Sequence, residues 1–336
     1  MLTNDSLTIY NHFIRKMKPS IRNQLKRWYD SIHIPKLNKK SITFETMTLS
    51  DPKSQIGDID LYFLSEQIKS EIYKLKYFSD CRVSLSKNRS IPIKIYHSTE
   101  SIVPLLKVLC ECIHMVESLT SDRKSFTMVY FLTDKKKRVS QQKPHVMTSN
   151  EINSGCILFN NNTIHIWRKE DILRVTIHEL MHLYNLELNK PLIERLELHY
   201  QKKYSISGPL IINEGYVDFW ANIYHLYLLS RLYDNEDVFI QGLFVEIAFS
   251  HYQAKKIMRL KKEPMNQYTS PFSYYVFKAE LFSLVLQCKD IYTYLDKERF
   301  MKDALDNQVM IQSGSKPNLS IVSKTLKMNA IDIHIL

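Results

Sequence analysis

The segment Cys156–Leu188, CILFNNNTIHIWRKEDILRVTIHELMHLYNLEL, joins two short apolar stretches to a long helical pattern. The stretches Cys156–Asn160 and Thr163–Trp167 flank Asn161–Asn162, and asparagine tolerates the positive φ that a tight hairpin turn requires. From Asp171 to Leu188 apolar residues recur at helical spacing, and the acidic residues that open this stretch suit the positive end of a helix dipole. The segment therefore predicts a β-hairpin followed at once by a helix.

The sequence on either side of this segment predicts different kinds of structure. Upstream, period-2 and helical patterns alternate, giving strands at Ile42–Met47, Cys81–Leu85, Ile91–Tyr96 and Phe126–Leu132, helices at Ile59–Tyr77 and Ile102–Leu119, and one or two short helices in residues 1–30 broken at Pro19. Downstream, long apolar periodicity predicts helices at Leu192–Lys203, Ile212–Tyr233, Val238–Lys262 and Ser273–Tyr294. The expected fold class is α+β, with a sheet in the first half and a mainly helical second half.

Length and pattern together suggest three regions. The chain has 336 residues and 44% hydrophobic residues, enough for a sizeable core. We expect an N-terminal α/β region of unknown role at residues 1–85, a sheet-containing subdomain at 86–190 and a helical subdomain at 191–336.

The net charge of +11 is spread along the chain, with local runs at Lys135–Arg138 and Lys255–Lys262. Such runs usually form a solvated face, and no basic motif with interleaved aromatic residues accompanies them. A nucleic-acid partner is therefore disfavoured.

The five cysteines are odd in number, and no pair has the spacing of a zinc knuckle, so free thiols in a reducing compartment are expected. The first twenty residues contain no apolar run typical of a signal peptide, and no stretch is long and apolar enough for a membrane span. We expect a cytoplasmic protein with no membrane partner. The oligomeric state is not predicted.

Within the central helical pattern, His178, Glu179 and His182 form an H-E-x-x-H motif. Residues four apart share one face of a helix, so both imidazoles can reach a single ion. Glu179 then points to the side where a metal-bound water would lie. The motif predicts a Zn²⁺ site with His178 and His182 as ligands and Glu179 as general base.

A simpler explanation is a packing helix that happens to carry two histidines. Leu173, Ile177, Leu180, Met181 and Tyr184 already supply a continuous apolar stripe. The polar triplet would thus be buried at a cost unless it has a partner, which favours the metal site.

Catalytic zinc takes three protein ligands, and the best candidate for the third is Glu214. It begins an apolar helical pattern, with Asp218 one turn further on the same face. Asp218 could accept the ring N–H of a zinc-bound histidine. The alternative for Glu214 is a helix-start carboxylate that only interacts with the helix dipole.

The H-E-x-x-H motif followed by Asn213-Glu214 and Asp218 resembles the gluzincins, a family of zinc peptidases that includes thermolysin and the membrane-alanyl aminopeptidases. The resemblance covers residues 90–290 and is strongest at 175–220. It implies a zincin-like fold, a small mixed sheet with an active-site helix followed by a helical subdomain. It implies His178, His182 and Glu214 as zinc ligands, Glu179 as base and Asp218 behind the ligands.

Two departures from the family pattern stand out. The gap between His182 and Glu214 is longer than usual in gluzincins, so an additional helical hairpin at Leu192–Lys203 must fit there. The aminopeptidase G-x-M-E-N signature is absent. Glu151, near its place, could bind a substrate amine, but we favour a solvated loop carboxylate.

The expected activity is that of a zinc-dependent peptidase acting on a peptide or protein substrate. A strand of the Cys156–Trp167 hairpin is expected to pair with the substrate backbone. A tyrosine from the second half, Tyr275 in preference to Tyr274, is expected to stabilise the oxyanion, with His225 and His251 as lesser candidates. The alternatives are a zinc hydrolase of another amide bond and a catalytically silent zincin-fold binding or scaffold protein.

Overall fold

The structure is a computed structural model that describes residues 2–37, 43–49, 64–86, 89–138, 147, 149–259, 270–287, 292–293, 296–306, 325 and 327–335. The chain divides into two compact units. The sheet unit comprises residues 34–136, 153–186 and 334–336, and the helical unit comprises residues 1–33, 137–152 and 187–333. None of the described helices is long and apolar enough to cross a membrane.

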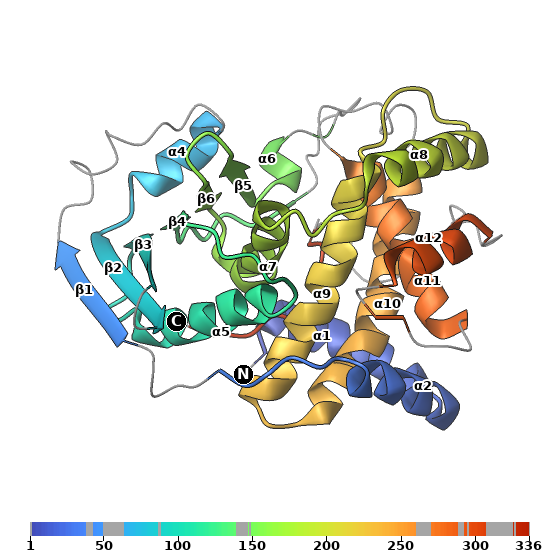
Figure 1. The fold of residues 1–336 in the computed structure, drawn as a ribbon, viewed down its shortest axis with the longest axis horizontal. Coiled ribbons are helices and arrows are strands. Elements are labelled where there is room, and N and C mark those ends of the chain that lie inside the picture. Colours follow the sequence, from blue (N-terminus) through green and yellow to red (C-terminus); the bar gives the residue numbers. More distant parts are fainter. Residues whose placement is uncertain are drawn as a thin grey trace. The chain divides into compact units, whose positions relative to one another are not determined.

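The sheet unit is built on a mixed six-stranded sheet in the order β1-β2-β3-β4-β6-β5 (Figure 1). Its strands are β1 (Thr43–Leu49), β2 (Tyr77–Ser86), β3 (Arg89–His97), β4 (Thr127–Phe131), β5 (Gly155–Leu158) and β6 (Thr163–Ile166). The pairs β3–β4 and β4–β6 are parallel, and the other three pairs are antiparallel. The α+β class and the described part of every predicted strand are confirmed, and β5 lies at one edge of the sheet. Ile42, the first residue of the predicted Ile42–Met47, lies outside the described residues.

Side chains alternate across β4 and so attach helices to both faces of the sheet. Val129 and Phe131 join an apolar cluster with Ile68 and Ile72 of α4 (Glu66–Ile72). The intervening Tyr130 points to the opposite face, where its hydroxyl bonds Thr176 of α7 (Ile172–Leu183) at 3.0 Å. Helix α5 (Val103–Glu117) packs against α7. The helix carrying the predicted metal ligands is therefore fixed to the sheet.

The predicted hairpin is confirmed. Strands β5 and β6 pair antiparallel from Gly155 opposite Ile166 to Leu158 opposite Thr163. Asn162 in the turn has a φ of 52°, the left-handed conformation that asparagine adopts more readily than most residues. A short 3-10 turn, Lys169–Asp171, leads directly into α7.

Helix α7 ends before the predicted Leu188. Asn185 adopts a φ of 53°, its N–H donates to the carbonyl of His182, and the N–H of Leu186 donates to the carbonyl of Met181. This pair of bonds is a Schellman motif, which closes a helix at a left-handed residue. The prediction was wrong because apolar spacing continues past a residue suited to ending the helix.

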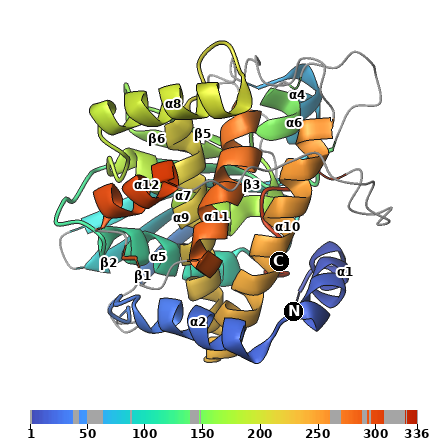
Figure 2. The same cartoon turned by 90° about the vertical axis from the view of Figure 1, so that its right-hand side faces the viewer.

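The helical unit contains the remaining helices. They are α1 (Asn4–Phe13), η1 (Ile14–Lys16), α2 (Pro19–Asp30), α6 (Ser149–Ile152), α8 (Lys190–Tyr204), α9 (Ile212–Leu232), α10 (Glu236–Arg259), the π-helical η4 (Phe272–Phe277), α11 (Lys278–Gln287) and α12 (Lys297–Asp306). Helices α9, α10 and α11 pack against one another (Figure 2). The break at Pro19 and the helix within the long His182–Glu214 gap are confirmed.

Other predicted helices were wrong in extent. Of Ile59–Tyr77 the described part is helical only at Glu66–Ile72, because Tyr77 already pairs with His97 in the sheet. Residues 59–63 lie outside the described residues. The helix predicted to reach Tyr294 is helical in its described part to Gln287, but residues 292–293 are not helical, and residues 288–291 and 294 lie outside the described part of the chain. Residues 260–262, at the end of the predicted Val238–Lys262, also lie outside it, so the end of that helix stays a prediction.

The units divide the chain differently from the three predicted regions. The predicted boundary at residue 85 falls inside β2, and residues 1–33 belong to the helical unit. The change to the helical unit after Leu186 lies close to the predicted boundary at 190.

The predicted solvated character of the basic runs was wrong at two positions. Lys137 is buried, with its ammonium 3.5 Å from the sulfur of Met328, and Lys256 is buried and donates to the carbonyl of Thr325. Burial lowers the pKa of Lys256 to about 7. These two lysines are therefore part of the packing of the helical unit.

Candidate metal centre

Helix α7 places His178, Glu179 and His182 within a little more than one helical turn. The three residues are 5%, 6% and 8% exposed. The Nε2 atoms of His178 and His182 lie 3.1 Å apart, and their ring planes are inclined by 70°. Both rings therefore direct the same nitrogen to one point.

This separation fits a shared metal ion. Two imidazole nitrogens that bind zinc at about 2.05 Å with a tetrahedral angle are about 3.3 Å apart. The same distance also suits a hydrogen bond in which one neutral ring donates to the other. The donor pair in the sheet unit thus matches zinc without any rearrangement of the helix.

Contacts at both ends of α7 hold this pair in place. At the carboxyl end, the ammonium of Lys124 donates to the carbonyl of Leu183. This carbonyl lies in the last turn of the helix and is not an acceptor of the two Schellman bonds. Before the amino end, Asp171 is fully buried, accepts from Ser154 and lies 3.6 Å from Arg174. Asp171, predicted to interact with the dipole at the start of the helix, thus also has two specific side-chain partners.

The carboxylate of Glu179 lies against strand β5. A Cβ added to Gly155 would come within 2.9 Å of Glu179 Oε1 and 2.6 Å of Val175 Cγ1. Only glycine leaves room for this approach of strand and helix. Burial and, to a smaller degree, the charge of Glu179 raise the pKa of the Cys156 thiol, so this neighbour is uncharged.

In the helical unit, Glu214 lies in the first turn of α9 and is half-buried. Its Oε2 accepts a hydrogen bond of 2.5 Å from the hydroxyl of Tyr274. The preceding Asn213 accepts from the backbone N–H of Leu188 through its side-chain oxygen. Asn213 therefore has a structural role in the N-E-G stretch, fixing the start of α9 to the segment before α8.

The backbone just before Glu214 is strained. Ile211, the residue that precedes α9, has a φ of 47°. A β-branched side chain rarely adopts this left-handed conformation, which costs about 1–3 kcal/mol and persists where the surroundings enforce it. The start of α9 is thus determined by its neighbours rather than by local preference.

Asp218 is fully buried one turn beyond Glu214 and forms a 2.6 Å ion pair with Lys278 of α11. The same ammonium donates to the carbonyl of Met328. Sequence reasoning missed Lys278, because a lysine in an apolar helical pattern gives no sign of burial. The predicted bond from Asp218 to a zinc-bound histidine stays a prediction.

The other predicted residues have the following places in the helical unit. Tyr275 is 1% exposed and belongs to an apolar cluster with Met147, Ile152, Ile257 and Met328; its role at the oxyanion stays a prediction. His225 is buried in α9, and His251 of α10 bonds Ser283 of α11 at 3.0 Å.

The expected solvation of Glu151 was wrong. Glu151 is 8% exposed within α6, because the adjacent Ile152 draws this short helix into the apolar cluster.

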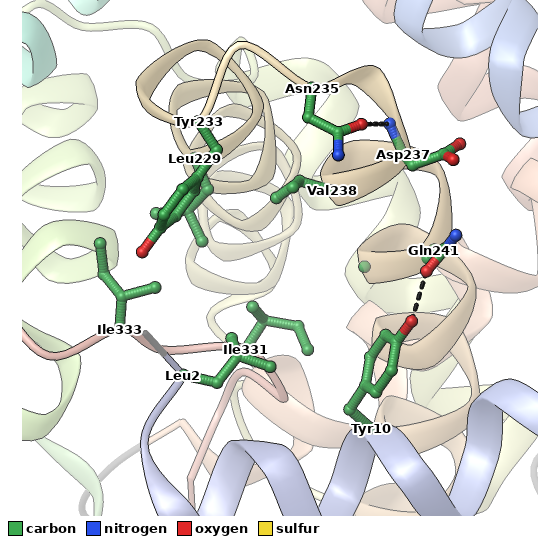
Figure 3. Close-up of a pocket in the computed structure, with 11 residues that line it drawn as sticks. Leu2, Tyr10, Leu229, Tyr233, Asn235, Asp237, Val238, Gln241, Ile331 and Ile333 are labelled. Atoms are coloured by element: carbon green, nitrogen blue, oxygen red, sulfur yellow. Dashed lines mark hydrogen bonds between the residues drawn. The ribbon is translucent and has the colours of Figure 1, made fainter.

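A separate cavity of about 390 Å³ lies in the helical unit (Figure 3). Its apolar lining includes Leu2 and Ile333 near the two chain ends and Leu229 and Val238 of α9 and α10, with a hydrogen bond from Tyr10 to Gln241 on its wall. None of the predicted site residues lines it.

Comparison of the chain with protein-family models, with curated proteins and with solved structures found no match.

Proposed function

We propose that this chain is a zinc-dependent peptidase in which His178, His182 and Glu214 bind one zinc ion. The observation that carries the proposal is the 3.1 Å separation of the two histidine Nε2 atoms on a helix that also carries Glu179. Glu214 is proposed as the third ligand because Asn213-Glu214, with Asp218 one turn later, follows the H-E-x-x-H motif in the sequence. Two imidazoles and one carboxylate are a donor set used by catalytic zinc, with the fourth position left for water.

The chemistry requires a base beside the metal, and Glu179 is proposed for this role. Bound zinc would lower the pKa of a water molecule and polarise the carbonyl of the bond to be cleaved. The Glu179 carboxylate would accept a proton from this water and then donate it to the nitrogen of the cleaved peptide bond. Its position against Gly155 keeps one carboxylate oxygen near the edge strand.

The edge strand supports a peptide as substrate. Strand β5 is the last strand in the sheet order and pairs with β6 on one side. An extended peptide can add to such an edge through backbone hydrogen bonds, which give affinity without a strong sequence preference. We propose that β5 holds the substrate backbone next to Glu179, whose carboxylate contacts this strand.

The deciding experiment replaces Glu179 by Gln in the full chain. Zinc content is measured first, followed by cleavage of a peptide library with one equivalent of zinc. We expect Glu179→Gln to keep the metal and to lose activity by about 10²–10⁴-fold, the usual contribution of a general base. Glu194→Gln, the same change at an exposed position on α8, is the control and should leave both readings unchanged.

Each outcome separates the alternatives. A native protein that binds no zinc would overturn the metal site. Unchanged cleavage by Glu179→Gln would overturn the base, and zinc binding without cleavage of any peptide would favour the binding or scaffold alternative.

A further inference from the structure

Two polar contacts join α9 to the η4–α11 segment in the helical unit. The hydroxyl of Tyr274 donates to Glu214 at 2.5 Å, and the ammonium of Lys278 donates to Asp218 at 2.6 Å. Glu214 and Asp218 are four residues apart on α9, so their side chains leave the same face of the helix. The two contacts therefore fix both the position and the rotation of the first turns of α9.

The backbones meet between these two contacts, at Gly215. A Cβ at Gly215 would lie 2.4 Å from the carbonyl oxygen of Ser273 and 2.6 Å from Cδ1 of Phe277. The hydroxyl of Ser273 also donates to the carbonyl of Leu210, just before α9 begins. Close approach at Gly215 thus brings the Tyr274 hydroxyl within reach of Glu214.

The element that supplies Tyr274 is itself unusual. Residues Phe272–Phe277 form a π-helical turn that continues as α11. Single π-helical turns inside helices are rare and frequently occur at functional sites. On the other helix, Ile211 has a positive φ immediately before α9 begins. Glu214 is therefore placed between two departures from regular backbone geometry.

We propose that Tyr274 is a positioning residue that orients the Glu214 carboxylate for metal binding. The inference rests on the proposed function, since it requires Glu214 to be a ligand. A glutamate side chain has several rotatable bonds, and a hydrogen bond to Oε2 selects one orientation of the carboxylate. The ion pair between Lys278 and Asp218 holds the next turn of α9. The Glu214 carboxylate is thus held by Tyr274, and the helix that carries it is held by Lys278.

The test compares the zinc affinity of the native full chain with that of Tyr274→Phe, measured by competition with a chromophoric chelator. This change removes one hydroxyl and retains the ring. Outer partners of metal ligands typically contribute 10–100-fold to affinity, and we expect a weakening in about this range. Thermal unfolding of the metal-free protein shows whether the variant remains folded.

The matched control is Tyr204→Phe. Tyr204 also donates its hydroxyl to a buried glutamate, Glu280, within the same unit. Its loss should leave zinc affinity unchanged. If Tyr274→Phe and Tyr204→Phe weakened zinc binding equally, the effect would be a general loss of packing and the proposal would be wrong.

A double-mutant cycle with Glu214→Gln tests whether Tyr274 acts through Glu214. We expect Tyr274→Phe to add little to the weakening in the Glu214→Gln background, because the carboxylate that it orients is already gone. An undiminished effect there would overturn the inference. Native affinity in Tyr274→Phe would overturn it too while leaving the peptidase proposal intact, whereas a native chain that binds no zinc would overturn both.

Discussion

The sheet unit and the helical unit hold their candidate metal-binding residues by different means. His178, Glu179 and His182 belong to one helix, so the hydrogen bonds of that helix place the two histidines on the same face, where their Nε2 atoms lie 3.1 Å apart. Glu214 depends on Tyr274, a residue 60 positions away on another helix. The first arrangement is local and needs only that the helix forms, whereas the second requires the helices of its unit to be packed.

The largest effect expected from this difference concerns zinc affinity in His182→Ala and Glu214→Ala. His182→Ala removes one of two imidazoles already directed to the same point. Loss of a residue that only contacts a metal ligand weakens binding by up to about 100-fold, and we expect His182→Ala to weaken zinc binding by more than this. Glu214→Ala leaves the imidazole pair intact, and imidazole suits zinc better than carboxylate does. We therefore expect a smaller loss in Glu214→Ala, measured by chelator competition.

Asp296→Ala, in the loop before α12, is the control and should not change zinc affinity. A greater loss in Glu214→Ala than in His182→Ala would show that the contact between helices, and not the helical pair, dominates binding. The comparison between the units would then be reversed.

The next effect concerns the two glycines that allow close approach in each unit. At Gly215 the obstacle to a Cβ is the backbone carbonyl of Ser273, which cannot move without moving η4. At Gly155 the obstacles are side-chain atoms of Val175 and Glu179. Overpacking costs about 1–3 kcal/mol. We therefore expect Gly215→Ala to lower the free energy of unfolding, measured in urea, by an amount near the upper value, and Gly155→Ala by an amount near the lower one.

Gly155→Ala should instead displace the Glu179 carboxylate and reduce peptide cleavage with zinc still bound. Gly242→Ala in α10 is the control, because Cδ2 at the end of the Leu226 side chain, at 2.8 Å, is the one atom among the three nearest to its added Cβ that lies closer than ordinary contact. Equal destabilisation by Gly155→Ala and Gly215→Ala would contradict the distinction between side-chain and backbone obstacles.

The last expected effect is a pH dependence of the helical unit. Burial, assisted by the charge of Lys255, lowers the pKa of His251 to about 4. Because an unfolded histidine titrates near 6.5, the unfolded chain binds a proton that the folded chain does not as the pH falls from about 6.5 to 4. We expect this to remove about 1–3 kcal/mol of stability over that range.

His251→Gln should reduce this acid-induced loss when unfolding is followed at pH 7 and pH 5. His114→Gln, on α5 of the sheet unit, is the matched control for replacing a histidine. An identical pH dependence in His251→Gln and the native chain would show that His251 does not titrate as its burial requires.

Elements with a local signal could be predicted from the sequence. The hairpin followed from Asn161–Asn162 between apolar stretches, and the helix of His178 and His182 followed from apolar spacing. The early end of α7 also had a local signal, Asn185, which apolar periodicity outweighed. The π-helical turn at Phe272–Phe277 has no such signal, because its sequence continues the same apolar pattern as the helix after it.

The candidate site divides in the same way. The sequence by itself determined that His178, Glu179 and His182 share one helix, because a helix fixes residues four apart through its own hydrogen bonds. Only the tertiary structure decided that Tyr274, among 20 tyrosines, bonds Glu214 and that Lys278 is buried against Asp218. Contacts across 60 residues depend on how helices pack, and packing depends on the shapes of many side chains at once.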